Sequence, residues 1–258
     1  MEIHHQHHHD LPQHKEKLWR HYALEFFMLF LAVSAGFFAE NLREEIKNKN
    51  QVQEDVRSML SDLEADSTLL NAVLAGNNYA TKMCDTLITV LAGNRNNTGE
   101  IYFLARNITA NMGNFIFNDK TFQQMKSSGT LRLIELRALL DSIGNYYSGT
   151  EWLTNRGSEL AARRVDEVIK DNNELFSASV FQQMMHINYS NYEDSMVQVN
   201  RPEGNPPLLS TDPAKINQVA TNYHYLYAAV GFYDKSGVLV QQKNHRLIAL
   251  IRKEYHFE

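Results

Sequence analysis

The sequence is poor in the residues that interrupt regular structure, with 12 glycines and 5 prolines among 258 residues. This scarcity disfavours a β-sandwich with many tight turns and favours long helices. Cysteine is even rarer, because Cys84 is the only one in the sequence. A single cysteine forms no disulfide within the chain and no thiolate metal cage. An oxidising compartment is therefore permitted but not required.

Positive charge and enzyme motifs are also lacking. The net charge is −5, and no basic stripe alternates with aromatic residues, which argues against nucleic-acid binding. We find no glycine-rich phosphate loop, nucleophile elbow, His-Glu-x-x-His motif or EF-hand loop. The Glu-x-x-His pairs of di-iron helical bundles are absent too. We therefore expect neither catalysis nor a cofactor.

The most informative stretch that is present is "YALEFFMLFLAVSAGFFA", residues 22–39, in which Glu25 is the only charge. As a helix, eighteen residues span about 27 Å, close to the roughly 30 Å hydrocarbon core of a bilayer. Trp19 and Tyr22 lie where an aromatic belt anchors a membrane helix. The large apolar side chains point in every direction, unlike those of a soluble core helix, and no clean cleavage site follows for a signal peptide. These features predict an uncleaved transmembrane helix over residues 19–41.

Glu25 has two interpretations within this helix. It is either a carboxylate at the membrane interface, paired with His21 one turn earlier, or part of a helix–helix contact. The second interpretation follows from Ala32 and Gly36, which share its helix face and form a small-xxx-small step that lets helices approach closely. A homo-oligomer through this face would gather several Glu25 side chains.

Basic residues flank the apolar stretch on both sides, so the orientation is nearly balanced. The basic residues before it, Lys15, Lys17 and Arg20, lie closer together in the sequence than those that follow. By the positive-inside rule we expect the N-terminus in the cytoplasm and most of the chain outside it.

Residues 42–258 read as an all-α soluble domain, so the fold class is all-α: an N-terminal transmembrane helix that continues into a multi-helix bundle. Apolar residues in 4-3 spacing predict a first helix that packs on the rest of the domain, with Asp66 replacing one apolar residue. The apolar residues of this seam are Val52, Val56, Met59, Leu63, Leu70 and Val73. We expect Gly76-Asn77-Asn78 to end that helix.

The remaining elements are predicted from apolar stripes and capping residues. Residues 187–213 read as a surface loop, and Asp212-Pro213 as the N-cap and first residue of the next helix. The expected helices cover 79–92, about 98–112, a short piece ending in a turn at 127–129, a helix with Leu133, Leu136, Leu140 and Ile143 inward, one from a Thr150 cap to about Met185, and two at the end separated at Gly237.

The N-terminal tail, residues 1–18, is rich in histidine and is expected to be disordered. Neutral imidazoles bind Zn²⁺, Ni²⁺ or Cu²⁺, so the tail is a candidate for weak metal binding, although a mobile tail supplies no fixed geometry. The candidate ligands are His4, His5, His7, His8 and His9.

Two stretches carry a resemblance. A His-rich start followed by "KLWRHYALEFFMLFLAVSAGFFAENLREE" and "VRSMLSDLEAD", together with the later "TFQQMKSSGTLRLI" and "LLDSIGNYY", resembles an uncharacterised family of single-pass membrane-anchored proteins from Bacteroidota-type Gram-negative bacteria. The resemblance implies an inner-membrane protein with a periplasmic domain and a native His tail, and it brings no activity. It places Glu40 with Glu25 in the family's characteristic stretch, which adds Glu40 to the expected helix interface.

The sequence thus leads to a main functional hypothesis and two alternatives. The main one is a membrane-anchored helical protein that binds itself or another envelope protein, with no catalysis and with the lipid bilayer as a further partner. The first alternative is a domain that senses a small ligand between its helices. The second is an enzyme of a type that no motif reveals.

Overall fold

The computed structural model describes the backbone of residues 13–186 and 198–257, and the side chains of residues 19–185 and 198–257. These residues are almost entirely helical, so the all-α prediction is confirmed. Two short strands, β1 (Met185–His186) and β2 (Gln198–Val199), pair antiparallel. The helices are α1 (Gln13–Ala92), α2 (Thr98–Ala110), α3 (Lys120–Ser128), the 3₁₀ turn η1 (Thr130–Leu133), α4 (Arg137–Trp152), the π-helical turn η2 (Leu153–Gly157), α5 (Ser158–Leu175), α6 (Ala178–Met184) and α7 (Pro213–Tyr255).

The chain divides into two units, Met1–Gln53 and Glu54–Glu258. In the first unit the described residues form the N-terminal part of α1, whose side chains are almost all exposed. The second unit holds the remaining part of α1 and every other element. The sequence-based boundaries at 18/19 and 41/42 both lie inside α1 and stay predictions.

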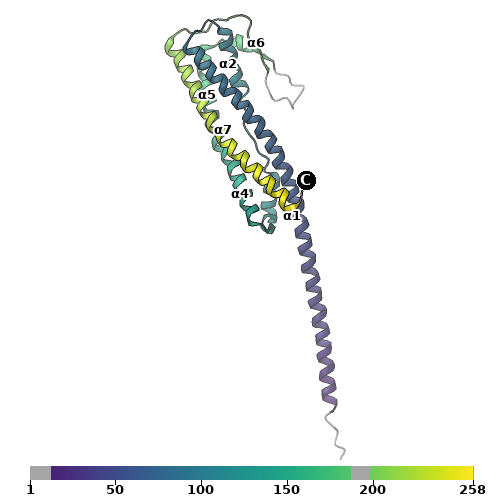
Figure 1. Ribbon diagram of the computed structural model, residues 1–258. Helices are drawn as coiled ribbons and strands as arrows, with labels where there is room; N and C mark the ends of the chain where they lie inside the picture. The colour runs from purple at the N-terminus through teal and green to yellow at the C-terminus, as the bar shows by residue number, and fades with distance from the viewer. Residues whose placement is uncertain (1–12, 187–197, 258) are drawn as a thin grey trace, which may run out of the picture. The chain divides into compact units, whose positions relative to one another are not determined.

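The second unit is a bundle in which α7 packs along α4 and α5, with α1 beside it (Figure 1). The seam predicted on α1 is buried here, so its expected packing inside the domain is confirmed. Val56, Met59, Leu63, Leu70 and Val73 are each at most 8% exposed. A larger apolar cluster joins α1 to α2, α5 and α7, and includes Leu87, Leu91, Ile101, Ile108, Val168, Leu226 and Val230.

Two predicted helix ends are wrong, at Gly76-Asn77-Asn78 and at Gly237, because both sites are used where α1 meets α7. Helix α1 continues to Ala92, and α7 is one helix from Pro213 to Tyr255. Asn77 is buried and donates a 2.9 Å hydrogen bond from Nδ2 to Oδ1 of Asp234 on α7. A Cβ at Gly237 would lie 2.9 Å from Leu74 Cδ2, so glycine allows the two helices to approach closely. Asparagine and glycine, which often end helices, here form the contact between α1 and α7.

Thr150 is not a helix cap, which is a second correction. It lies buried within α4, and its hydroxyl donates to the carbonyl of Tyr147 at 2.9 Å. The π-helical turn then joins α4 to α5 without a break. The predicted helix to about Met185 is also divided, because α5 ends at Leu175. Phe176 turns inward there, with its ring 5.0 Å from that of Tyr102.

The stripe predicted to face inward over residues 133–143 is only partly correct. Ile143 is buried, whereas Leu133 is 42% exposed. Thr130–Leu133 forms a 3₁₀ turn and α4 begins only at Arg137, so the spacing of the stripe does not belong to one helix.

Capping residues predict other boundaries correctly. Asp212 Oδ1 accepts a 2.9 Å hydrogen bond from the Ala214 N–H, with Pro213 at the first helical position. In the predicted loop 187–213, residues 187–197 lie outside the described part. Gln198–Val199 form β2, so the loop prediction is wrong at these two residues, whereas residues 200–212 contain no helix or strand and agree with it.

Candidate functional site

The predicted metal ligands His4, His5, His7, His8 and His9 lie outside the described residues. Within residues 19–185 and 198–257, no group of three or more His, Cys, Asp or Glu side chains is placed to hold a metal ion.

In the apolar stretch of α1, the large apolar side chains are 51–77% exposed. An 18-residue window in this helix has a mean hydropathy of 1.8, and none of the window is buried within the chain. Phe26 and Phe37 are each 70% exposed, and Phe38 is 77% exposed. A helix of this length and composition is a candidate membrane span, and a core helix or a signal sequence meets the same criterion.

The predicted interface residues Glu25, Ala32, Gly36 and Glu40 all lie exposed on α1. A Cβ at Gly36 would meet no atom within 4 Å, so this side of the helix is open. Glu40 forms an ion pair with Arg43 one turn later, with 2.9 Å between the carboxylate oxygen and the guanidinium nitrogen. The described His21 and Glu25 side chains share no hydrogen bond or ion pair, and the His21 ring lies beside Tyr22 instead. The oligomer interface itself stays a prediction.

A polar cluster lies inside the second unit around Asp66, the residue that interrupts the apolar seam. Asp66 is 3% exposed. Its Oδ1 accepts a 2.8 Å hydrogen bond from the Asn118 N–H, and its Oδ2 accepts one of 2.6 Å from the Tyr146 hydroxyl. One turn earlier, Asp62 accepts from Asn118 Nδ2 at 2.8 Å and from Thr121. The two carboxylates hold the irregular segment 111–119 and the start of α3 against α1.

Burial governs the electrostatics of this cluster. Desolvation raises the pKa of Asp66, although its hydrogen bonds from Tyr146 and Asn118 act in the opposite direction. Burial, followed by the charge of Asp66, also raises the pKa of Tyr146 and of Tyr147. The Tyr147 hydroxyl has no hydrogen-bond partner among the described residues. Donors already occupy both oxygens of each carboxylate, so the arrangement is a structural clamp and not an open acid–base site.

The Asn77–Asp234 pair is a second buried polar contact. Burial raises the pKa of Asp234 to about 6, against the hydrogen bond from Asn77. Asn77 Oδ1 is buried without a donor among the described residues. A protonated Asp234 carboxyl has a hydroxyl to offer to such an acceptor, whereas the carboxylate has none.

A third polar contact ties α5 to α7 and α2. Asn172 Nδ2 donates to the Tyr223 hydroxyl at 2.9 Å, and that hydroxyl donates to the Ala105 carbonyl at 3.3 Å. On the same helix, Asp171 accepts from Gln218 at 2.8 Å. These bonds satisfy polar groups in the core and fix the register of the helices.

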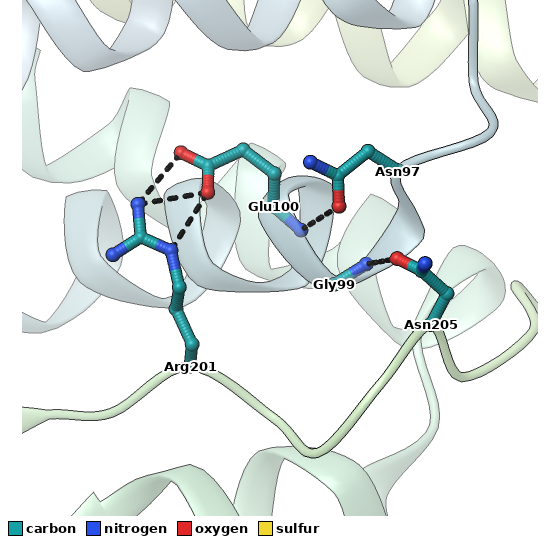
Figure 2. Close-up of polar contacts among 5 residues, drawn as sticks. All are labelled: Asn97, Gly99, Glu100, Arg201 and Asn205. Carbon is teal, nitrogen blue, oxygen red and sulfur yellow. Dashed lines mark hydrogen bonds and ion pairs between the residues drawn. The ribbon is translucent and has the colours of Figure 1, made fainter.

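Residues 201–205 are fastened across the start of α2, as Figure 2 shows. Arg201 makes a two-pronged ion pair with Glu100, through Nε at 2.8 Å and a terminal nitrogen at 3.1 Å. Asn205 Oδ1 accepts from the Gly99 N–H at 3.1 Å, and Asn97 caps the helix by accepting from Glu100. A Cβ at residue 99 would lie 2.5 Å from the Gly204 carbonyl oxygen, so this approach requires glycine. The N–H groups of Gly99 and Glu100, two of those that an anion at this helix start would need, are thus already occupied.

An exposed apolar strip follows α7 and the junction of α4 with the π turn. We define the apolar strip as Trp152, Tyr225, Phe232 and Leu239, which are 40–54% exposed. The Trp152 and Phe232 rings lie 5.9 Å apart, edge to face, and Arg164 stacks over Tyr225 at 5.1 Å. On α7 the strip residues recur every seven positions, which places them on one face of the helix. Clustered exposed aromatic residues are typical of protein-binding surfaces.

Sequence reasoning found Asp66 as an interruption of the seam but missed its partners. Asn118 and Tyr146 lie 52 and 80 residues further along the chain, too far for any local pattern. The seven-residue spacing of Tyr225, Phe232 and Leu239 is visible in the sequence. It was not used to predict the apolar strip, because the apolar patterns were interpreted as buried stripes only.

The chain was compared with protein-family models, with curated proteins and with solved structures, and none of these comparisons found a match. The exposed apolar stretch of α1 and the apolar strip are therefore the basis for the functional proposal.

Proposed function

We propose that this chain is a single-pass membrane-anchored protein whose helical domain binds another protein at the cell envelope, without catalysis. In this proposal residues 19–41 cross the inner membrane, the N-terminal tail lies in the cytoplasm and the domain lies in the periplasm. The resemblance of the opening stretch to membrane-anchored proteins agrees with that location.

The exposed apolar stretch of α1 is the observation that carries the anchor. Burying a phenylalanine side chain is favourable by about 1.5–3 kcal/mol, and this stretch buries none of its rings within the chain. A lipid bilayer supplies an apolar environment of matching length. The continuation of α1 as one helix to Ala92 supports an anchor that stays attached to the domain.

The apolar strip supports the interaction role. Its four side chains lie on the domain and not on the anchor, so lipid is not their expected partner. Aromatic residues dominate binding hot spots because they bury a large area at a low cost in side-chain entropy. The small-ligand alternative remains a prediction without a specific observation in its favour.

Membrane extraction tests the anchor. The full chain should remain in the membrane pellet after an alkaline carbonate wash and should need detergent for release. Leu31→Arg should move it toward the soluble fraction, because arginine at the centre of a membrane helix costs about 2.5–3.5 kcal/mol. Leu239→Arg is the matched control, since Leu239 is similarly exposed but lies on the domain. Recovery of the unchanged chain in buffer without detergent would refute the proposal.

Affinity capture from a detergent extract tests the interaction role. A specific partner should be captured by the unchanged chain and lost with Phe232→Glu at the centre of the strip. Tyr79→Glu is the control, because Tyr79 is 54% exposed on α1 outside the strip. Equal capture by all three proteins would show that the strip is not the binding surface.

A further inference from the structure

A notch beside Ser34 interrupts the apolar surface of α1. From Trp19 to Lys47, Ser34 is the single described residue that is partly buried, while the others are exposed. The notch has a volume of about 370 Å³ and is open on one side, so it suits a protruding side chain better than an enclosed ligand. Its lining consists of Phe30, Val33, Ser34, Phe37, Phe38 and Asn41.

Two polar side chains on this face lack partners. Ser34 and Asn41 are seven residues apart and therefore share a helix face. Neither makes a hydrogen bond with another described residue, whereas Ser58 and Thr68 on the same helix each donate to the carbonyl four residues earlier. In a lipid environment, polar side chains of this kind bond across helix–helix contacts.

We propose that the Phe30–Ser34–Phe37–Asn41 face of α1 binds a second copy of the same helix within the membrane. This inference rests on the proposed membrane anchor. Two parallel helices related by a two-fold axis would each place a phenylalanine ring in the other's notch, with Asn41 beside Asn41 of the partner subunit. Lipid chains fill the notch but offer no hydrogen bond to Ser34 or Asn41.

The shape of the face favours a second copy over an unrelated helix. Phe30 and Phe37 stand one turn on either side of Ser34, so the same sequence supplies both the protruding rings and the recess. Identical helices also enter the membrane in the same orientation, which places ring and recess at the same depth. Ser34 lies about 200° around the helix from Gly36, so this face is nearly opposite the one that carries Ala32 and Gly36.

Cysteine cross-linking in membranes that contain the full chain distinguishes the two faces. Cys84 can remain in place, because it is 2% exposed and burial raises the pKa of its thiol to about 12. Single substitutions would be Phe30→Cys, Ser34→Cys and Phe37→Cys on the proposed face. Leu29→Cys, Ala32→Cys and Gly36→Cys are the matched set on the opposite face. Mild oxidation should give disulfide-linked dimers from the first set only.

A notch-filling variant gives a second readout. Ser34→Leu should lower the cross-linking yield at Phe37→Cys about tenfold, whereas Gly36→Leu should leave it unchanged. The inference would be overturned if the Ala32 and Gly36 set gave cross-links. It would also be overturned if neither set gave cross-links although the chain resisted carbonate extraction. Failure of the chain to resist carbonate extraction would instead refute the membrane anchor, so the two failures are separable.

Discussion

Asp234 illustrates how burial at one residue creates a dependence on pH. Its pKa is raised to about 6 in the fold, above its ordinary value near 3.8. A carboxyl with a raised folded-state pKa contributes stability that is fully present below its unfolded pKa and is lost as the pH rises through its folded pKa. The contribution of Asp234 should therefore disappear between about pH 4 and pH 6.

Asp234→Asn should stabilise the protein at pH 7.5 by about 1 kcal/mol, because a neutral amide retains the bond from Asn77 and has a donor for Asn77 Oδ1. Thermal unfolding of the detergent-solubilised chain from pH 4 to 8 would measure this, and the variant should lose part of its pH dependence between pH 4 and 6. Asp85→Asn, at an exposed position of α1, is the control. Identical profiles for both variants would contradict the role of Asp234.

Tyr146 also makes a buried polar contact, as the donor to Asp66. Tyr146→Phe removes the 2.6 Å bond to a buried carboxylate oxygen and should destabilise the domain by about 1–3 kcal/mol. Urea unfolding at pH 7 measures the change. Tyr79→Phe, on the exposed side of α1, should shift the midpoint little. A loss no greater than that of the control would show that Asp66 does not depend on this donor.

At the scale of the element, two glycines on α7 have opposite roles. Gly237 faces Leu74 at close range, while a Cβ at Gly231 would meet nothing within 4 Å. Gly237→Leu should destabilise the domain by about 1–3 kcal/mol through overpacking. Gly231→Ala should stabilise it by about 0.5–1 kcal/mol, because alanine favours the helix.

Denaturant midpoints of the two variants, together with Gly237→Leu/Leu74→Ala, test this assignment. The double variant should recover part of the loss, since shortening Leu74 makes room for the new side chain. If Gly237→Leu is as stable as the unchanged chain, α1 and α7 do not depend on their close approach.

Sequence reasoning succeeded for elements whose ends are defined locally. Asp212 with Pro213 marks the start of α7 through residues that are adjacent in the chain. It failed at Asn77 and Gly237, because the residues that keep these helices continuous lie more than 150 positions away. The clamp at Asp66 was anticipated only as a polar exception in an apolar seam. A single sequence carries no record of such distant partners.

At the scale of the molecule, the division into two units predicts that the second one folds alone. Residues 54–258 contain the buried clusters, the Asp66 clamp and the apolar strip. A chain that begins at Glu54 should be soluble without detergent and should unfold cooperatively on heating, because it retains every buried core residue except Val52. Circular dichroism during heating measures this transition. An aggregated or unfolded fragment would indicate that the domain needs the apolar stretch for its stability.

The π-helical turn at Leu153–Gly157 has a consequence for the whole rod formed by α4 and α5. A π turn contains one residue more than the α-helical turn it replaces, so it rotates everything after it by about 100°. Tyr146 and Val168 are 22 residues apart, close to six α-helical turns, and both are buried, so the π turn changes the direction of the buried face between α4 and α5.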